Sequence, residues 1–160
     1  MAGLFNCIAM QIDWNIYSFD TLTPAQLYAI MKLRSRIFVV EQNCVYLDAD
    51  DKDVHCLHFC GWHGDQLTAY TRLVPVGISY PEYPSIGRVV AAPEYRGLKL
   101  GRKLMEKSID HCLEKFGALP IKIGAQLYLH SFYSSLSFEQ SSPVYLEDNI
   151  EHIEMIYYPK

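Results

Sequence analysis

The chain has 160 residues, half of them apolar and one fifth charged, which is an ordinary globular balance. We expect residues 1–160 to form a single domain that buries about two thirds of its unfolded surface. A net charge of −4 argues against a nucleic-acid binder, and no apolar run or leader pattern indicates a membrane span or a secretory signal. Five unevenly spaced cysteines indicate free thiols, so we expect the protein to be cytoplasmic.

The N-terminal part of the chain predicts a strand followed by a helix. Residues 8–17 alternate loosely between apolar and polar side chains and carry Trp14, which favours a strand. Thr23 and Gln26 have the spacing of a capping box, and Pro24 stands at the first helical position. Apolar side chains then recur at helical spacing over residues 27–38, so we expect a helix of about four turns that ends within residues 39–43.

Four aspartates, Asp48, Asp50, Asp51 and Asp53, cluster in an expected loop. A calcium-binding loop that began at Asp48 would need Gly at its sixth position and Glu at its twelfth, and the chain has Asp and Phe there. Two interpretations remain for this cluster. It is either a solvated acidic loop or a negative rim that attracts a cationic amine.

The segment from His55 to Cys60 has the residue types of a metal site. In a strand, Cys56, His58 and Cys60 share one face, and three ligands on a flat face differ from the turn-borne spacing of structural zinc sites. We therefore predict no metal here, but buried thiols and a packed or hydrogen-bonded histidine.

The middle of the chain predicts a hairpin, a central strand and a long helix. Residues 61–66 indicate the turn into a strand at residues 67–74. The stretch that begins at Ser85 ends in an apolar run at residues 89–92, which Pro93 stops, and this is typical of a buried strand. The helix that follows has a buried face at helical spacing: Leu104, Met105, Ser108, Ile109, Cys112, Leu113 and Phe116.

Basic residues crowd the expected start of this helix, at Arg96, Lys99, Arg102 and Lys103. A helix N-terminus carries a partial positive charge and unpaired N–H groups, so basic residues are disfavoured there unless an anion binds. The window is therefore either a phosphate or pyrophosphate site or an exposed basic turn on a surface helix.

The C-terminal part predicts a strand at residues 121–128, interrupted at Gly124, and a short helix at residues 130–136. Strands at residues 144–146 and 153–158 then form a terminal hairpin.

Several of these segments resemble one family. Residues 96–101, Arg-Gly-Leu-Lys-Leu-Gly, resemble the pyrophosphate loop of the GNAT N-acetyltransferases, in which Arg or Gln is followed by two residues, Gly, one residue, and Gly or Ala. Lys99 departs from that pattern, and Ser137 stands where a Gly usually ends the preceding helix. Residues 27–44 resemble the ElaA-like branch of the superfamily. Further segments match that branch in order, at residues 58–62, 69–73, 86–90, 124–126 and 132–133.

The resemblance implies an α/β (α+β) GNAT fold. Such a fold has a mixed, mostly antiparallel central sheet of six to seven strands, flanked by about four helices and splayed at its central strands. It also implies that acetyl-CoA lies in the gap between those strands as the co-substrate. The residues implied to bind it are Val89, Val90, Ala91, Arg96, Gly97, Leu98, Lys99, Leu100, Gly101 and Arg102.

The implied reaction is direct transfer of an acetyl group to a primary amine in a ternary complex. By resemblance Tyr133 is the general acid that protonates the leaving thiolate, against the alternative of a tyrosine that only packs. Glu41 and His58 are candidate bases because both are expected near the cleft, although each also has a structural interpretation. Arg88 and Gln126 either line the acceptor pocket or tie strands together.

Two other functions stay open on the sequence. One is a non-catalytic acetyl-CoA-binding sensor, and the other is a nucleotide-binding module, which the lack of a complete Walker or dinucleotide loop disfavours. Acidic residues expected near the mouth favour a small cationic amine, a peptide N-terminus or a lysine as acceptor. They lie at residues 48–53 and at Glu147, Asp148 and Glu151. The sequence does not fix the oligomeric state, and a homodimer is one option.

Overall fold

The computed structural model describes residues 10–160, so the start of the predicted first strand, at residues 8 and 9, lies outside the described residues. The strands are β1 (Asp13–Ser18), β2 (Leu57–His63), β3 (Gln66–Val74), β4 (Ser85–Ala91), β5 (Ile121–Gln126), β6 (Phe138–Gln140), β7 (Tyr145–Glu147) and β8 (Ile150–Tyr157). The α-helices are α1 (Pro24–Arg34), α2 (Leu100–Phe116) and α3 (His130–Ser134), and a π-helix, η2 (Ser35–Glu41), continues α1. Short 3₁₀ turns are η1 (Phe19–Thr21), η3 (Asp53–His55), η4 (Pro93–Tyr95) and η5 (Leu127–Leu129).

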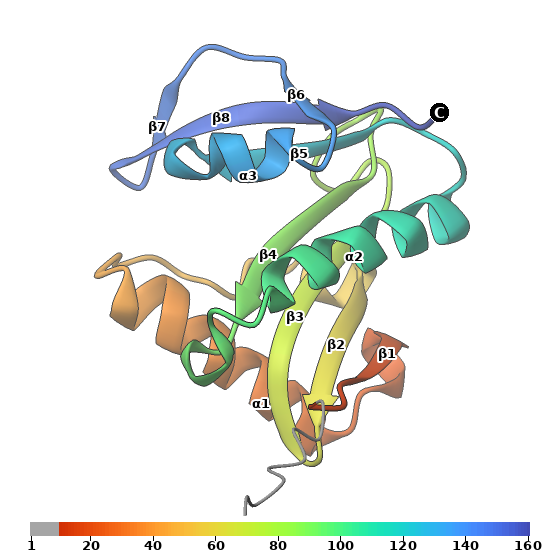
Figure 1. Cartoon of the computed structure of the whole chain (residues 1–160), viewed down its shortest axis with the longest axis vertical. Coiled ribbons are helices and arrows are strands. Elements are labelled where there is room, and N and C mark those ends of the chain that lie inside the picture. Colours follow the sequence, from red (N-terminus) through yellow and green to blue (C-terminus); the bar gives the residue numbers. More distant parts are fainter. Residues whose placement is uncertain (1–9) are drawn as a thin grey trace, which may run out of the picture.

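The strands form two four-stranded sheets (Figure 1). The N-terminal sheet has the order β1-β2-β3-β4, and in the C-terminal sheet β8 pairs with β5, β6 and β7. Every strand pair within these sheets is antiparallel. The described part of the chain therefore confirms the predicted α/β architecture, with eight strands and three α-helices in place of six to seven strands and about four helices.

The two long helices cover opposite faces of the N-terminal sheet, α2 in front of β3 and β4 in Figure 1 and α1 behind them. Because both faces are covered, all of β3 after its first residue is buried. The one polar residue on the predicted buried face of α2, Ser108, shares a hydrogen bond of 2.7 Å with Thr71 of β3. Its hydroxyl also donates to the Leu104 carbonyl, so this polar pair is satisfied inside the core.

Local sequence signals account for most boundaries. The Thr23 side chain accepts from the Gln26 N–H and the Gln26 side chain accepts from the Thr23 N–H, which confirms the capping box. Gly64, with φ +57°, occupies the two-residue turn between β2 and β3. The terminal hairpin turns at Asp148 and Asn149, both with positive φ, as a type I′ turn requires.

Two elements had no clear signal in the sequence. The π-helix arises where the Gln42 N–H reaches back five residues to the Ile37 carbonyl, and an apolar helical pattern does not distinguish this widened turn from an α-helix. Strand β6 is only three residues long, too short for an alternating pattern, and its pairing with β8 defines it.

The two sheets meet at one end and diverge from there. The Lys122 N–H at the start of β5 donates to the Pro84 carbonyl just before β4, at 3.0 Å. Beyond this bond β4 pairs with β3 and β5 pairs with β8, so the facing edges of β4 and β5 separate. Figure 1 shows β4 running diagonally down while the C-terminal sheet lies across the top. This is the splay that the sequence predicted at the central strands.

Three arginines and three aspartates form a closed ring of alternating charges beneath the splay. Each arginine bridges two aspartates and each aspartate bridges two arginines, at N···O distances of 2.6 to 3.4 Å. In order around this arginine–aspartate ring the members are Arg34, Asp48, Arg88, Asp50, Arg72 and Asp53. The ring ties α1, β3 and β4 to the loop at residues 48–53.

The ring corrects both interpretations of the acidic cluster. Asp48 and Asp53 are buried and Asp50 is partly buried, so these carboxylates neither sit in water nor form a free negative rim. Of the four, only Asp51 is exposed. The nearby guanidinium groups hold the pKa values of Asp50 and Asp53 below the usual range, although burial alone would raise them. A single-sequence pattern could not show that arginines from three distant elements converge here.

The ring generates a stability prediction for Arg34→Met. This change leaves Asp48 and Asp53 buried without one partner, and breaking a buried ion pair costs about 3–5 kcal/mol. Arg36→Met, two residues further along the chain, removes an exposed pair with Glu94 and should cost less than about 1 kcal/mol. Urea unfolding monitored by circular dichroism measures both free energies. Equal, small losses for the two variants would contradict the structural role of the ring.

Acid should weaken the same ring. Because the folded-state pKa values of Asp50 and Asp53 are lowered, their stabilisation is complete above the pKa of an unfolded aspartate and is lost as the pH falls toward the folded values. We expect the free energy of unfolding to drop steeply below about pH 4. Asp53→Asn should flatten this dependence, whereas Asp51→Asn on the exposed neighbour should not. Parallel pH curves for all three proteins would refute the assignment.

Candidate functional site

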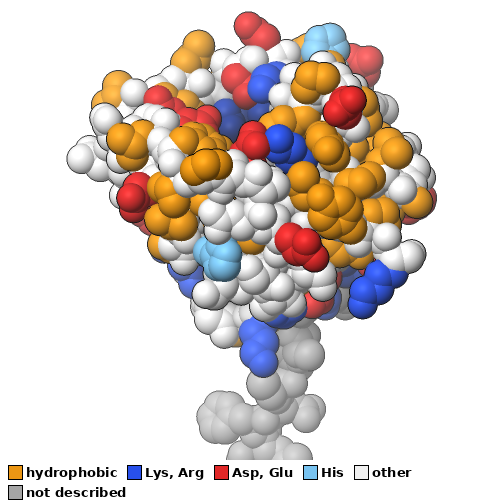
Figure 2. Space-filling view, turned by 90° about the horizontal axis from the view of Figure 1, so that it is seen from above, with side chains coloured by type: hydrophobic (Ala, Val, Ile, Leu, Met, Phe, Trp, Pro, Cys, Tyr) orange, Lys and Arg blue, Asp and Glu red, His pale blue; other side chains and the backbone are white. Residues whose placement is uncertain are grey.

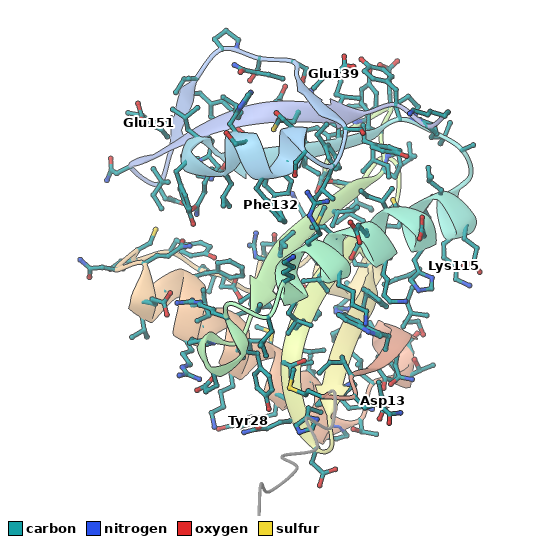
Figure 3. All side chains as sticks on the ribbon, in the orientation of Figure 1. Asp13, Tyr28, Lys115, Phe132, Glu139 and Glu151 are labelled. Atoms are coloured by element: carbon teal, nitrogen blue, oxygen red, sulfur yellow. The ribbon has the colours of Figure 1, made fainter. Side chains whose placement is uncertain are left out.

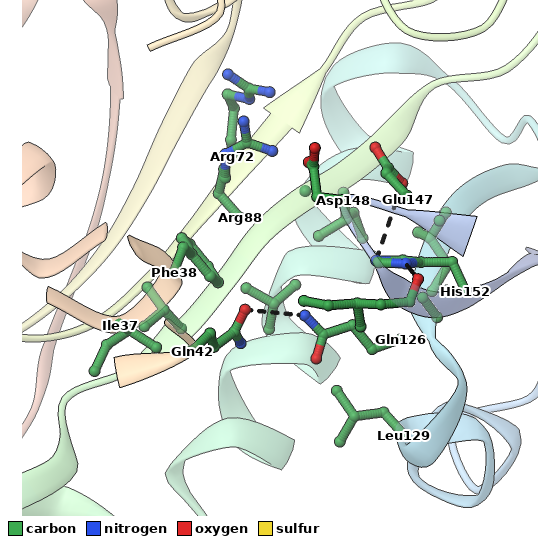
Figure 4. Close-up of a pocket in the computed structure, with 18 of the residues that line it drawn as sticks. Ile37, Phe38, Gln42, Arg72, Arg88, Gln126, Leu129, Glu147, Asp148 and His152 are labelled. Atoms are coloured by element: carbon green, nitrogen blue, oxygen red, sulfur yellow. Dashed lines mark hydrogen bonds and ion pairs between the residues drawn. The ribbon is translucent and has the colours of Figure 1, made fainter. Parts of the chain in front are cut away.

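A cleft of about 630 Å³ lies between β4 and the C-terminal sheet. Its walls come from the π-helix and the loop that follows it, from β4, and from β5, α3 and the β7–β8 hairpin. Figure 4 shows how side chains from these separate parts of the chain converge on the cleft. The splay of β4 and β5 is what opens this space.

The wall formed by β4 presents Val89, Val90 and Ala91 to the cleft. This edge of β4 faces away from β3, its one sheet partner among residues 10–160, so its backbone groups are available to an extended ligand. The register of β3 and β4 shifts between Tyr70 and Arg72, where Arg88 on β4 has φ +53°. This bulge turns the Arg88 side chain toward Asp48 in the arginine–aspartate ring.

The predicted pyrophosphate loop follows η4 and leads into α2. Lys99 is the N-cap of α2, in the left-handed conformation with φ +55°, and its side chain does not cap the helix. Gly97 also has positive φ, at +83°. The first turn of α2 has no acidic residue, so its N–H groups keep their partial positive charge. Of the residues predicted to bind the cofactor in this loop, Arg96 lines the cleft and residues 97–102 do not.

Tyr133 of α3 lines the cleft while only 6% of its surface is exposed. Its ring packs edge-on against Phe132 and Phe138, at centroid distances of 5.1 and 5.9 Å. In Figure 3 the side chain of Phe132 extends from α3 toward α2. Among the described residues the Tyr133 hydroxyl has no hydrogen-bond partner, and burial raises its pKa. The phenol therefore keeps its proton and can donate it to a group in the cleft.

The two candidate bases lie in different places. Glu41, at the end of the π-helix, lines the cleft and pairs with Arg96 at 2.5 Å. His58 is fully buried, outside the cleft, and the expectation that it lies near the cleft is corrected. Its ring nitrogens bond the Tyr70 hydroxyl and the Asp53 carbonyl, and burial lowers its pKa. His58 thus supports the loop that carries the arginine–aspartate ring.

Two polar residues predicted to line the acceptor pocket or to tie strands together are both at the cleft. Arg88 lines it and is held in the arginine–aspartate ring. Gln126, at the end of β5, donates from Nε2 to Oε1 of Gln42 at 3.1 Å, across the cleft (Figure 4). This amide pair links the two halves of the molecule at the open end of the splay.

The β7–β8 hairpin contributes Tyr145 and His152 to the cleft, which the sequence analysis did not single out, together with Glu147, which it expected near the mouth. The sequence feature that could have identified His152 is the alternation of apolar and polar side chains along β8. Ile153 and Met155 are buried in the core, so His152 and Glu154 project from the opposite face of the strand. Knowing that this face borders a cleft required the fold.

The described residues contain no group of three or more His, Cys, Asp or Glu side chains placed to hold a metal ion. Cys56, Cys60 and Cys112 are buried free thiols, and burial raises the pKa of Cys56 to about 11. No helix in residues 10–160 is long and apolar enough to cross a membrane. The face seen in Figure 2 carries both acidic and basic side chains among apolar ones.

Comparison with known proteins decides the family. Residues 59–158 match the family model described as an acetyltransferase (GNAT) domain. The chain belongs to the GNAT acetyltransferase family. Among curated relatives, the protein ElaA of Escherichia coli is 40% identical over 146 residues, which cover 90% of this chain and 95% of ElaA. The ElaA-like resemblance seen in the sequence is therefore confirmed.

Solved structures support the same GNAT assignment. The crystal structure of an acyl-CoA N-acyltransferase from Pseudomonas aeruginosa matches with a TM-score of 0.87 and 36% identity, over 92% of this chain and 99% of that one. The crystal structure of Escherichia coli ElaA matches with a TM-score of 0.86 and 38% identity, with the same coverage. GNAT acyltransferases use an acyl-CoA, and acyl transfer to an amine is the general reaction that the family supports.

The conformation of Lys99 generates a second stability prediction. A left-handed φ is costly for a side chain with a Cβ and free for glycine, so Lys99→Gly should leave the free energy of unfolding unchanged or raise it by up to about 1 kcal/mol. Lys103→Gly, the same substitution inside the first turns of α2, should lower it by about 1 kcal/mol. Chemical denaturation compares the two variants. A loss at Lys99 as large as the loss at Lys103 would contradict this account.

Proposed function

We propose that this protein transfers an acetyl group from acetyl-CoA to a primary amine, by direct attack of the amine in a ternary complex. The observation that carries the proposal is the free Tyr133 hydroxyl inside a cleft whose two central strands present unpaired edges. Direct transfer needs a donor for the leaving thiolate beside a place for the extended arm of the cofactor. Membership of the GNAT family supports acyl transfer as the type of reaction.

The start of α2 suits the pyrophosphate of the cofactor. A helix N-terminus without an acidic first turn or a capping side chain binds anions through its backbone N–H groups. Arg96, Lys99 and Arg102 add positive charge at the same end. Arg96 pairs with Glu41. When the pyrophosphate binds, the Arg96 guanidinium must therefore either leave the carboxylate or contact both groups.

The pantetheine arm fits the free edge of β4. Its two amide groups can pair with backbone groups of Val89, Val90 and Ala91 in the way an added strand does. The arm then leads from the loop at residues 96–102 into the cleft, where Tyr133 lies. Its phenol donates a proton to the sulfur as the C–S bond breaks.

The charges of the cleft favour a cationic acceptor. The aspartates beneath the cleft are neutralised in the arginine–aspartate ring, and Glu41 is paired with Arg96. The carboxylates that remain at the cleft are those of Glu147 and Asp148 on the β7–β8 hairpin. They favour an amine that arrives as an ammonium ion, such as a small amine, a peptide N-terminus or a lysine.

Cofactor binding is tested by thermal shift. Acetyl-CoA at about one hundred times its dissociation constant adds about 2.7 kcal/mol to the stability of the folded state. For a domain of this size that is a rise in Tm of roughly 5 °C or more. ATP and NADPH serve as controls and should give smaller shifts. A larger shift with either control than with acetyl-CoA would overturn the proposal.

The role of Tyr133 is tested by Tyr133→Phe. We expect an unchanged dissociation constant for acetyl-CoA and a fall in thiol release with a primary amine of about 100-fold or more, because only the proton donor is lost. Tyr28→Phe is the matched control, since Tyr28 lies exposed on α1, away from the C-terminal sheet (Figure 3). Unchanged turnover in Tyr133→Phe would remove Tyr133 from the mechanism. Tight acetyl-CoA binding without thiol release by the wild type would favour a sensor.

A further inference from the structure

His152 occupies a distinctive place in the cleft. It lies on β8 between Gln126 of β5 and Tyr145 of β7, which are its partners in the sheet register. Its side chain is 13% exposed and borders the cleft (Figure 4). Its ring stacks on Tyr145, with centroids 5.9 Å apart and planes inclined by 28°. The imidazole is therefore held in one orientation by its neighbours.

The hydrogen bond of the ring fixes its tautomer. Nδ1 lies 2.8 Å from the carbonyl oxygen of Ile150. A carbonyl oxygen can only accept, so Nδ1 must carry the hydrogen. In the neutral ring Nε2 then has a free lone pair, which is the state a general base needs. The carboxylate of Glu147 lies 3.9 Å from Nε2, beyond hydrogen-bond distance, on the side of the ring where a proton would be taken up.

We propose that His152 is the general base that deprotonates the acceptor amine, with Ile150 and Glu147 as its positioning partners. The proposal rests on the acetyl transfer proposed above and supplies its missing proton acceptor. The other two candidates are less suited, since the Glu41 carboxylate pairs with Arg96 and His58 is buried outside the cleft. A base acts through direct hydrogen-bond reach or through one bridging water.

The protons balance as follows. The acceptor enters as RNH₃⁺ and gives one proton to Nε2, directly or through a water. The free amine attacks the thioester carbonyl carbon, a C–N bond forms, and the carbonyl π electrons move to oxygen. Their return expels the CoA thiolate as the C–S bond breaks, and the thiolate takes the Tyr133 proton. The surplus proton on the new amide nitrogen restores Tyr133, and the proton on His152 leaves to solvent.

Other ionisable groups face the ring. Tyr145 and Glu147 come from β7 and Asp148 from the turn, while the partner from β5, Gln126, is uncharged. On β8 itself Glu154 projects from the same face and pairs with Lys122 at 2.7 Å. The acidic group that lies close to Nε2 is therefore Glu147, at 3.9 Å.

The test is His152→Asn. The asparagine amide can still donate to the Ile150 carbonyl from the position of Nδ1, while the basic Nε2 is lost. We expect the dissociation constant of acetyl-CoA to stay within about twofold. Thiol release with 2-phenylethylamine at neutral pH should fall about 100-fold or more. The loss of wild-type kcat/KM on the acid side, where an imidazole base is protonated, should disappear in the variant. His55→Asn, on an exposed histidine outside the cleft, is the matched control and should keep the wild-type profile.

A second readout does not depend on activity. In the wild-type protein labelled with ¹⁵N-histidine, long-range ¹H–¹⁵N spectra of neutral His152 should show the hydrogen on Nδ1. A hydrogen on Nε2 would overturn the proposal, as would a wild-type pH profile in His152→Asn. Failure of the proposed function has a different signature: the wild type would not bind acetyl-CoA or would release no thiol, and the base assignment would then fall with it.

Discussion

The closed ring of Arg34, Arg72 and Arg88 with three aspartates is the interaction on which the site depends. Burying a single charge is expensive, and a buried ion pair repays that cost only when its hydrogen bonds are satisfied. Here every member has two partners of opposite sign, and three charges of each sign give no net charge; among the described residues only Nε of Arg72 in the ring is buried without a hydrogen bond. It fixes the loop at residues 48–53 against α1, β3 and β4, and it holds the bulge of β4 at Arg88 beneath the cleft.

The cleft follows from the way the two sheets join. One hydrogen bond, from Lys122 to Pro84, holds β4 and β5 together at their starts, and the Gln42–Gln126 pair links the two halves at the other end. Between these two links the strand edges are free to pair with a ligand. The π-helix that ends at Glu41 delivers Gln42 to the open end, which is consistent with the tendency of π-helical turns to occur at functional sites.

The elements that the sequence predicted well are those with local causes. The capping box at Thr23, the apolar face of α2 and the end of β4 at Pro93 each depend on residues close together in the chain. The features that it missed depend on distant partners. The aspartates near Asp48 form their ion pairs with arginines on three other elements. His152 lies at the site only because its strand borders the cleft. The role of Tyr133 came from the family resemblance, and that of the loop at Arg96 from the same resemblance together with the basic residues at the start of the helix.

The most direct measurement is a crystal structure of the protein with acetyl-CoA. The account predicts the pantetheine arm between β4 and β5, the pyrophosphate at the start of α2, and the sulfur within hydrogen-bond reach of the Tyr133 hydroxyl. It also predicts that Arg96 turns from Glu41 to the phosphates, or contacts both. A cofactor bound outside the cleft, or a sulfur far from Tyr133, would contradict the account.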